Sequence, residues 1–402
     1  MSIQIERHYS KTTATIKHSF IREILKLTKG VPGMISFAGG LPSPKSFPKD
    51  VLANLFSQVI KEEGDDILQY GASEGDAVFK NTIKVFEDVP QLLDEELMIT
   101  VGSTNGIYFF TRTLIDPGDI IICEAPSFPG SLAAMEACGA RIIGIEMDDF
   151  GMLPGQLKET LTRLLKKNEP VRFIYVIPEF QNPSGRTMAL DRRREIIDMA
   201  REFGLLILED QPYRELRFSG KRIMTLWELA RTEFNDPGLV TIVKTFSKIL
   251  GPGLRLGFAA GPQDIIGPMV KWAQKITVSP DCAAQRAAAR FIEQGYMKDH
   301  ILKIIDLYRP RRDAMLEALK TYMPEGVQWT IPEGGMFIWV AFDRSINTDK
   351  LFEKAVKNMV AFIPGSKFYT EGILKKNELR LNFSYCDINM IHAGIKRLAD
   401  LL

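Results

Sequence analysis

The sequence predicts an α/β protein. We expect a large domain with a mostly parallel sheet flanked by helices, a smaller α+β domain after it, and an N-terminal arm before it. Three observations predict this fold class: short apolar runs alternate with amphipathic helical patterns, the runs are unbroken, and the pattern changes after about residue 285. Unbroken apolar strands joined by helices are typical of a parallel sheet covered on both faces.

The N-terminal arm is expected over residues 1–48, packed with the small domain and the active site. Its second half is crowded with residues that interrupt helices and strands. These are Pro32, Gly33, Gly39, Gly40, Pro42, Pro44 and Pro48. The opening MSIQIERHYSKTTATIKHSF is too polar for a signal peptide, and no apolar run approaches the roughly 20 residues of a membrane span. We therefore expect a cytoplasmic protein without a membrane partner.

The large domain is expected over residues 49–285, where apolar runs predict buried strands. These runs are ELMITVG, DIIICEAP, RIIGIEM, VRFIYVIPEF, LLILED, LVTIVKTFS and GFAAG. Amphipathic stretches lie between several of them, and residues 190–204 are an example. The helical face expected there consists of Ile196, Ile197, Met199, Ala200 and Phe203.

The smaller domain is expected over residues 286–402. A long charged helix is predicted over about 299–320, and the apolar run GGMFIWVAF predicts a strand after it. A helix, a strand and a helix then complete the chain, which gives an α+β arrangement.

Composition narrows the classes of function. The chain has 51 Lys and Arg against 50 Asp and Glu, a net charge of +1, so nucleic acid is not an expected partner. The four cysteines are far apart and form no CxxC pair, which fits a reducing compartment rather than a disulfide framework or a zinc site. Only four histidines occur, none in an HExxH array, so no metal site is expected.

Polar residues follow the predicted strands, where ligands of open α/β sheets bind. They are Asn182 in QNPSG, Asp210 and Tyr213 in EDQPY, Lys248 after KTFS, and Ser103-Thr104 opening a helix. Each also has an ordinary structural explanation, such as a turn, a helix cap or a solvated side chain. Their common placement at one edge favours a binding site.

Two nucleotide-binding motifs are excluded. GPGLRLG has the spacing GxGxxxG and leads into a strand rather than a helix, and no GxxxxGK[ST] motif occurs.

The polar set suits pyridoxal 5′-phosphate, which needs a lysine for its aldehyde and an acidic partner for its pyridine nitrogen. Lys248 and Asp210 are expected to fill these roles. The phosphate needs hydroxyls, an arginine and a helix N-terminus, and the expected residues are Ser103, Thr104, Thr245, Ser247 and Arg255.

The rest of the ring has its own expected partners. Tyr213 and Asn182 are placed to hydrogen-bond the phenolic oxygen O3′. Phe128, in APSFPG, is either a stacking partner of the ring or a core aromatic.

Nine motifs occur in the order of a known family: PGMISFAGGLPSPKSFP, LQYGASEG, VGST, EAPSF, QNPSG, EDQPY, TFSKILGPGLRLG, EGGMF and LRLNFS. With them the chain resembles the class I/II aminotransferases, which are pyridoxal-phosphate-dependent enzymes of fold type I, over nearly its whole length. It is most similar to the 2-aminoadipate/kynurenine aminotransferase subgroup. The resemblance implies the PLP-dependent transferase fold type I and transfer of an amino group from an L-amino acid to a 2-oxo acid such as 2-oxoglutarate.

The resemblance also implies roles that the residues alone do not. Arg380 in ELRLNFS matches the arginine that binds the substrate carboxylate. Tyr70 in LQYGASEG matches a tyrosine that reaches the cofactor phosphate of a neighbouring subunit, so a homodimer with shared sites is implied. Gly40 matches an arm position over the substrate. Arg22 matches a position that some relatives use toward an acidic substrate, or it is a solvated helix residue.

The chain departs from the family pattern at two places. GSTNG replaces the more common GSQQ at the phosphate turn, and Phe128 stands where Tyr or Trp is frequent. Two other functions remain open at this point. One is β-elimination of C–S bonds on the same scaffold, and the other is a non-catalytic sensor domain of aminotransferase type.

Overall fold

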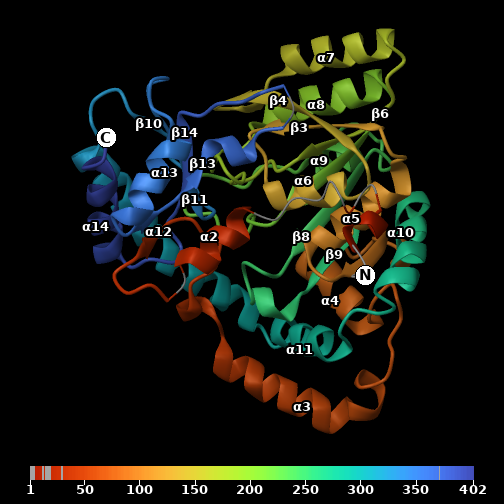
Figure 1. Ribbon diagram of the computed structural model, residues 1–402. Helices are drawn as coiled ribbons and strands as arrows, with labels where there is room; N and C mark the ends of the chain where they lie inside the picture. The colour runs from red at the N-terminus through yellow and green to blue at the C-terminus, as the bar shows by residue number, and fades with distance from the viewer. Residues whose placement is uncertain (1–4, 11–12, 14–19, 29, 371) are drawn as a thin grey trace.

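The computed structural model describes residues 5–10, 13, 20–28, 30–370 and 372–402. It contains an eight-stranded sheet and a four-stranded sheet, with helices packed against both (Figure 1). The predicted α/β class is thereby confirmed. Residues 1–4, 11, 12, 14–19 and 29 of the predicted arm lie outside the described residues.

The large sheet has the strand order β2-β9-β8-β7-β6-β3-β4-β5. Its strands are β2 (Leu97–Thr100), β3 (Ile120–Ala125), β4 (Arg141–Asp148), β5 (Gly151–Met152), β6 (Val171–Val176), β7 (Leu206–Gln211), β8 (Val240–Thr245) and β9 (Gly257–Ala260). The pairs from β8 through β7, β6 and β3 to β4 are parallel, whereas β9 and β5 run antiparallel to their neighbours. All the predicted strands are present in a mixed, mostly parallel sheet.

Helices cover both faces of this sheet, because its strands are apolar on both sides. One face packs against α5 (Ser103–Leu114), α6 (Pro129–Glu136) and α10 (Gln263–Ile276). The other packs against α4 (Ala77–Phe86), α7 (Pro154–Lys166), α8 (Leu190–Glu202), α9 (Leu226–Thr232) and α11 (Cys282–Glu293). The predicted apolar face of residues 190–204 is the buried face of α8.

The small sheet is antiparallel, in the order β10-β11-β14-β13. Its strands are β10 (Gln328–Trp329), β11 (Phe337–Ala341), β13 (Ile363–Pro364) and β14 (Glu378–Asn382). The helices beside it are α12 (Tyr296–Tyr322), α13 (Thr348–Lys357) and α14 (Ile388–Ala399), and the predicted helix 299–320 lies within α12. In Figure 1 the strands β10, β13 and β14 and the helices α13 and α14 are drawn in blue, on the left of the molecule.

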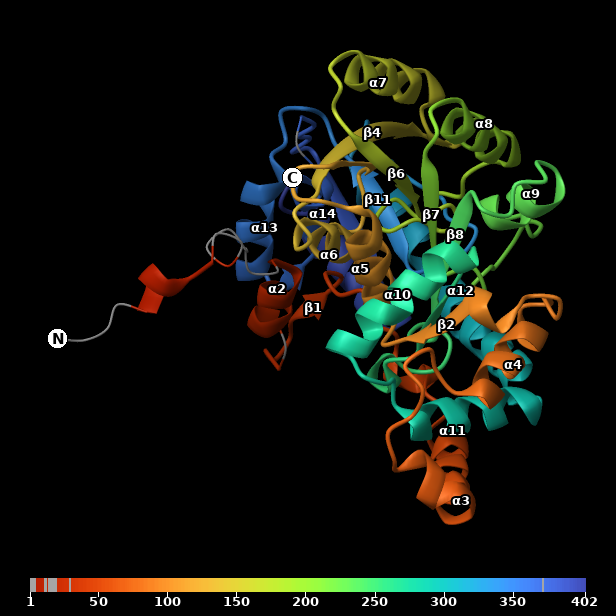
Figure 2. The ribbon, with the colours of Figure 1, turned by 90° about the vertical axis from the view of Figure 1, so that its right-hand side faces the viewer.

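The described part of the arm is joined to the elements beside the small sheet. Its strand β1 (Ile35–Ser36) pairs in parallel with β12 (Val360–Ala361). The carbonyl of Phe37 accepts a hydrogen bond from the amide of Asn382 at 2.9 Å, and Phe37 is fully buried. Figure 2 shows the preceding helix α2 (Phe20–Thr28) next to β1.

The remaining helices complete the chain. Helix α3 (Lys49–Ile67) packs along α11, at the bottom of Figure 1. Short 3₁₀ helices occur at Ile5–His8, Pro44–Ser46, Asp94–Glu96, Pro252–Leu254 and Gly365–Phe368. Because α11 runs across residue 285, the division of the chain into domains at residues 48 and 285 stays a prediction.

Candidate active site

The site lies at the edge where neighbouring parallel strands end. Strands β6, β7 and β8 pair in parallel and lie side by side. They lead to Asn182, Asp210 and Lys248 in that order, and β2 leads at the same edge into Ser103, the first residue of α5. The strand order therefore agrees with the prediction that these polar residues meet at one edge of the sheet.

Asp210 is a buried carboxylate with one free oxygen. Its side chain is 2% exposed, and its Oδ2 accepts a hydrogen bond from the Tyr175 hydroxyl at 2.8 Å. Its Oδ1 is also buried and has no hydrogen-bond partner in the described part of the chain. Burial raises the pKa of Asp210 to about 7, and the Tyr175 hydroxyl opposes this shift. A buried acceptor without a donor is costly, so this oxygen fits a ligand N–H.

Asn182, Tyr213 and Arg380 form a connected polar group beside Asp210. The Asn182 amide nitrogen donates to the Tyr213 hydroxyl at 3.2 Å. The Asn182 side-chain oxygen accepts from Arg380 Nη1 at 2.9 Å. The structure thus brings together the loop after β6, which carries Asn182, the segment after β7 and a residue of β14.

Arg380 is held in an apolar slot. Its guanidinium carbon lies 4.3 Å from the centre of the Phe337 ring and 5.1 Å from that of Phe368. Nη2 donates to the carbonyl of Ala38 at 2.6 Å, whereas Nε is buried and has no hydrogen-bond partner among the described residues. Burial lowers the pKa of Arg380 to about 10, so it remains a cation at neutral pH. A buried guanidinium without a carboxylate partner fits an anionic ligand group.

Two lysines near the end of β8 have opposite surroundings. Lys244 donates to Glu87 at 2.6 Å and to Glu215 at 2.7 Å. Burial acts to lower its pKa, but the charges of Glu215 and Glu87 raise it. Lys244 is therefore fixed as a structural cation.

Lys248 has no carboxylate neighbour among its hydrogen-bond partners in the described residues. Its Nζ donates to the Gly40 carbonyl at 3.0 Å. Burial, together with the charges of Arg380 and Arg255, lowers the pKa of Lys248 to about 8. Lys248, rather than Lys244, therefore has the environment of a reactive amine.

The start of α5 forms an anion cradle with Arg255. Gly102 has φ +76°, and a Cβ there would lie 2.7 Å from Arg255 Nη2. The N-cap of α5 has no side-chain hydrogen bond, and no acidic residue lies in its first turn. Across the cradle, the hydroxyls of Thr245 and Ser247 lie 2.8 Å apart. Free helix N–H groups, hydroxyls and an arginine suit a phosphate.

In the described part of the chain, the side chains of Ser103 and Thr104 make no hydrogen bond with this group, and neither do Phe128, Tyr70 and Arg22. Phe128 is partly buried at the start of α6 and packs against the core, so its stacking role stays a prediction. Tyr70 is 81% exposed. Arg22 is exposed on α2. The Gly40 carbonyl, in contrast, reaches Lys248 as described above.

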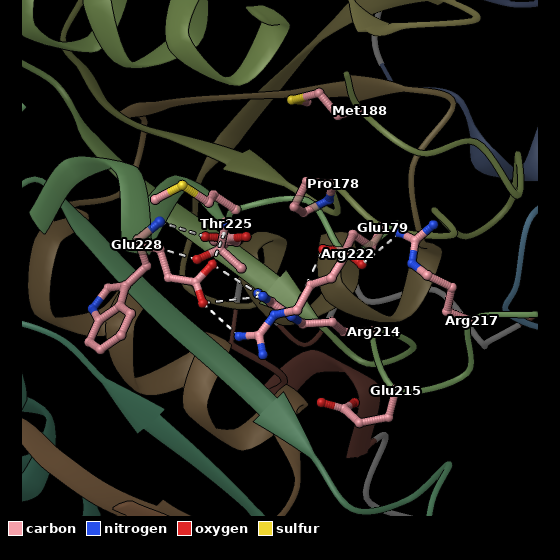
Figure 3. A network of polar contacts seen from close by, with 12 residues as sticks. Pro178, Glu179, Met188, Arg214, Glu215, Arg217, Arg222, Thr225 and Glu228 are labelled. Carbon is pink, nitrogen blue, oxygen red and sulfur yellow. Dashed lines mark hydrogen bonds and ion pairs between the residues drawn. The ribbon is translucent and has the colours of Figure 1, made fainter. Parts of the chain in front are cut away.

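The sequence analysis missed an ionic cluster that joins the segment after β6, which carries Asn182, to the segment after β7, which carries Tyr213. Glu179, in the loop of Asn182, is 3.2 Å from Arg217 and 3.5 Å from Arg193. Arg214, next to Tyr213, is 3.1 Å from Glu228 and 4.0 Å from Glu179. Figure 3 shows Arg217 and Arg214 directed at these carboxylates. The sequence did offer one signal for this cluster, because Glu179 is a charged residue at the end of the apolar run VRFIYVIP.

Tyr175 was also missed. It lies on β6 inside an apolar run, and a hydroxyl within a fully buried strand is the signal that points to a polar partner.

The residues present fit pyridoxal phosphate. The free Asp210 Oδ1 suits the pyridine nitrogen, the Lys248 amine suits the aldehyde, and the cradle at Arg255 suits the phosphate. Comparison with known proteins decides the family. The family model described as aminotransferase class I and II matches residues 42–398.

The chain belongs to the class I and II aminotransferases. Over 405 residues it is 37% identical to aromatic-amino-acid aminotransferase 1 of Thermococcus litoralis, with 100% of this chain and 95% of the relative covered. The predicted family is confirmed. The protein is an aminotransferase, and its cofactor is pyridoxal 5′-phosphate.

Solved structures agree with the fold. A kynurenine aminotransferase of Pyrococcus horikoshii in complex with PMP has a TM-score of 0.93 and 40% identity, with 99% of this chain and 97% of that chain covered. An alpha-aminoadipate aminotransferase of Thermus thermophilus, complexed with N-(5′-phosphopyridoxyl)-L-leucine, has a TM-score of 0.91 and 33% identity, with 100% and 98% covered. Fold type I is therefore confirmed.

Membrane-spanning helices and metal-binding groups are two features that the sequence does not lead us to expect. No helix among them has the length and apolarity needed to cross a membrane. No group of three or more His, Cys, Asp or Glu side chains within them is arranged to hold a metal ion.

The lowered pKa of Lys248 predicts how the cofactor-free protein takes up pyridoxal phosphate. Only the neutral amine attacks the aldehyde, and its fraction falls about tenfold for each pH unit below the pKa. We expect the attachment rate, followed by absorbance after mixing, to rise with pH until about 8 and then to level off. Lys248→Ala should show no attachment. A rate that keeps rising toward the ordinary lysine value of 10.5 would contradict the assignment.

Proposed function

We propose that this enzyme moves the amino group of an L-amino acid of the 2-aminoadipate, kynurenine, aromatic or branched-chain type to a 2-oxo acid such as 2-oxoglutarate. The observation that carries the proposal is the buried guanidinium of Arg380, which has an unpartnered Nε and lies in one polar group with Asn182 and Tyr213. Both substrates carry a carboxylate next to the reacting carbon. One arginine therefore serves both halves of the reaction.

Bound pyridoxal phosphate supplies an electron sink for the negative charge that develops at the substrate α-carbon. The free Oδ1 of Asp210 would accept a hydrogen bond from the protonated pyridine nitrogen, which would preserve that sink. Tyr213 and Asn182 would hydrogen-bond O3′. Ser103, Thr104, Thr245, Ser247 and Arg255 hold the phosphate, and Phe128 stacks on the ring.

Lys248 has two successive roles in the proposal. Its neutral amine first holds the aldehyde covalently. Once released by the substrate amine, its Nζ would serve as the base that accepts the proton from the substrate α-carbon. Its lowered pKa supports this, because an amine with a pKa of about 8 is partly neutral near physiological pH.

The arm contributes to closing the site. The carbonyls of Ala38 and Gly40 accept from Arg380 and Lys248, so one short arm segment touches both the substrate-binding arginine and the reactive lysine. We propose that this segment lies over the substrate and excludes water when the site closes. Arg22, on α2, is the proposed contact for an acidic substrate side chain.

The substrate proposal is tested with a panel of amino donors against 2-oxoglutarate. We expect glutamate formation with at least one of 2-aminoadipate, kynurenine, aromatic and branched-chain donors. Arg380→Lys should lower kcat/KM by about 10- to 100-fold for donor and acceptor alike, because a point charge replaces the two-pronged guanidinium. Arg309→Lys, on the exposed side of α12, is the matched control and should leave kcat/KM unchanged.

Two outcomes would contradict this proposal. One is that no donor in the panel yields glutamate, and release of pyruvate and ammonia from cysteine conjugates instead would favour β-elimination. The other is an Arg380→Lys enzyme with unchanged kcat/KM for both substrates.

We further propose a homodimer whose sites are shared. Tyr70 and Leu68 are 81% and 74% exposed, and Ile276 and Val278 are about half exposed. The Ser73 hydroxyl donates to the Val278 carbonyl, so these apolar side chains belong to adjoining segments. An exposed apolar patch of this kind supports an interface between copies. In it, Tyr70 of the partner subunit would reach the cofactor phosphate.

Sedimentation velocity should show a dimer. Tyr70→Phe should release the cofactor several-fold faster without dissociating the dimer, because only one phosphate hydrogen bond is lost. Tyr296→Phe, an exposed tyrosine elsewhere, should release it at the wild-type rate. An active monomer would refute the shared site.

The proposed location is the cytoplasm. All four cysteines are free in the structure, as is usual in a reducing compartment. Cell fractionation that recovered the protein elsewhere would overturn this placement.

A further inference from the structure

Asp210 has one oxygen bonded and one free, and a single neighbour accounts for this difference. Tyr175 and Asp210 are both fully enclosed by the large domain. The Tyr175 hydroxyl lies 2.8 Å from Oδ2 of Asp210, whereas Oδ1 has no partner in the described part of the chain. The two oxygens of this carboxylate are therefore not equivalent.

The pairing of β6 with β7 fixes this contact. Tyr175 lies opposite Leu208 in the register. Leu208 and Asp210 are two residues apart on β7 and share a face, so Tyr175 and Asp210 are diagonal neighbours. Both strands are central in the sheet, and α5, α6 and α10 cover this face. The Tyr175 ring therefore has little freedom to move away from Asp210.

The direction of the hydrogen bond is settled by chemistry. Burial and the nearby Asp210 charge raise the pKa of the Tyr175 hydroxyl well above its ordinary value. Tyr175 therefore keeps its proton and donates it toward the carboxylate. A hydrogen bond to a charged acceptor stabilises the charged form.

We propose that Tyr175 is a positioning residue: by donating to Oδ2 it turns Oδ1 of Asp210 toward the cofactor's pyridine nitrogen and keeps the proton on that nitrogen rather than on the carboxyl group. The inference rests on the proposed role of Asp210. A carboxylate that already accepts one hydrogen bond is a weaker base, so it withdraws less of the ring proton. The electron sink is then preserved in a site whose burial favours a neutral carboxyl group.

Other polar groups close to this pair come from three further elements. They are Glu124 of β3, Tyr213 after β7, and Ser131 of α6. The Glu124 carboxylate accepts from the Ile177 amide, and the Tyr213 hydroxyl accepts from Asn182. The Ser131 hydroxyl has no hydrogen-bond partner in the described part of the chain. Ser131 nevertheless lies close enough to oppose the rise in the pKa of both Asp210 and Tyr175, so it could replace Tyr175 as a donor, and the test includes it.

The test uses the holoenzyme loaded with pyridoxal phosphate that carries ¹⁵N at the ring nitrogen. In Tyr175→Phe, which removes only the hydroxyl, the ring ¹⁵N resonance should move from the protonated toward the unprotonated position. Tyr175→Phe combined with Ser131→Ala should move it at least as far. Replacement of Tyr175 by 3-fluorotyrosine, a stronger donor of similar size, should shift it the opposite way.

Kinetics give an independent measurement. The kcat of Tyr175→Phe should fall about tenfold, with little change in the KM of the amino donor, because the substrate-binding group at Arg380 is untouched. Tyr308→Phe is the matched control. It also removes a buried tyrosine hydroxyl, one that accepts from the Ser43 amide at 2.9 Å, and it should leave the ¹⁵N resonance in place.

Two results separate the failure of this inference from that of the function. A wild-type protein that binds no cofactor would overturn both. A loaded wild-type enzyme with a protonated ring nitrogen, whose ¹⁵N signal and kcat are unchanged in both Tyr175→Phe and the double variant, would overturn only the role of Tyr175.

Discussion

The parallel pairing of β6, β7 and β8 is the constraint on which the site depends. Each strand is buried on both faces, so its register is fixed, and its carboxyl end delivers one side chain to the same edge. Asn182, Asp210 and Lys248 reach the site in this way from positions far apart in the chain. The antiparallel β9 completes the arrangement. Gly257 begins it, and a Cβ there would lie 2.5 Å from the Lys244 carbonyl and 2.9 Å from Gly102 Cα, so only glycine lets β8, β9 and the start of α5 approach one another.

The buried polar groups of the site differ from the other buried charged groups near it in whether they have partners within the protein. Lys244 has two carboxylates around it, and Glu179 has three arginines, so each of these ions has partners of opposite charge within the protein. In the site, Oδ1 of Asp210 and Nε of Arg380 are buried and have no hydrogen-bond partner in the part of the chain that the structure describes. Such groups are costly to fold and gain their partners from a ligand. The ion pairs of Lys244 and Glu179 hold their segments in place. The unpartnered atoms of Asp210 and Arg380 are the ones that remain available to bind a ligand.

Much of the fold followed from local patterns. Seven of the eight strands of the large sheet were predicted because each is an apolar run, and the strand ends then indicated Asp210 and Lys248. The two-residue strand β5 (Gly151–Met152) was not predicted. The contacts of Arg380 could not be predicted in this way. They join β14 to Asn182 and to the arm, and no local spacing encodes such distances. The bond from Tyr175 to Asp210 depends on the register between two strands, which the sequence leaves open. The proposed roles of Tyr70, Phe128 and Arg22 came from the family resemblance, because each is explained equally well as an exposed or core side chain.

The central claim is that Lys248 is the lysine that carries the cofactor. Borohydride reduction of the loaded enzyme, followed by proteolysis and mass spectrometry, tests it most directly, because reduction makes the link to the lysine permanent. The account predicts a single phosphopyridoxyl group on the peptide that contains Lys248, and an unmodified Lys244 held between Glu87 and Glu215. A label on Lys244 or on any other lysine, or the absence of a label on a protein that retains its cofactor, would contradict it.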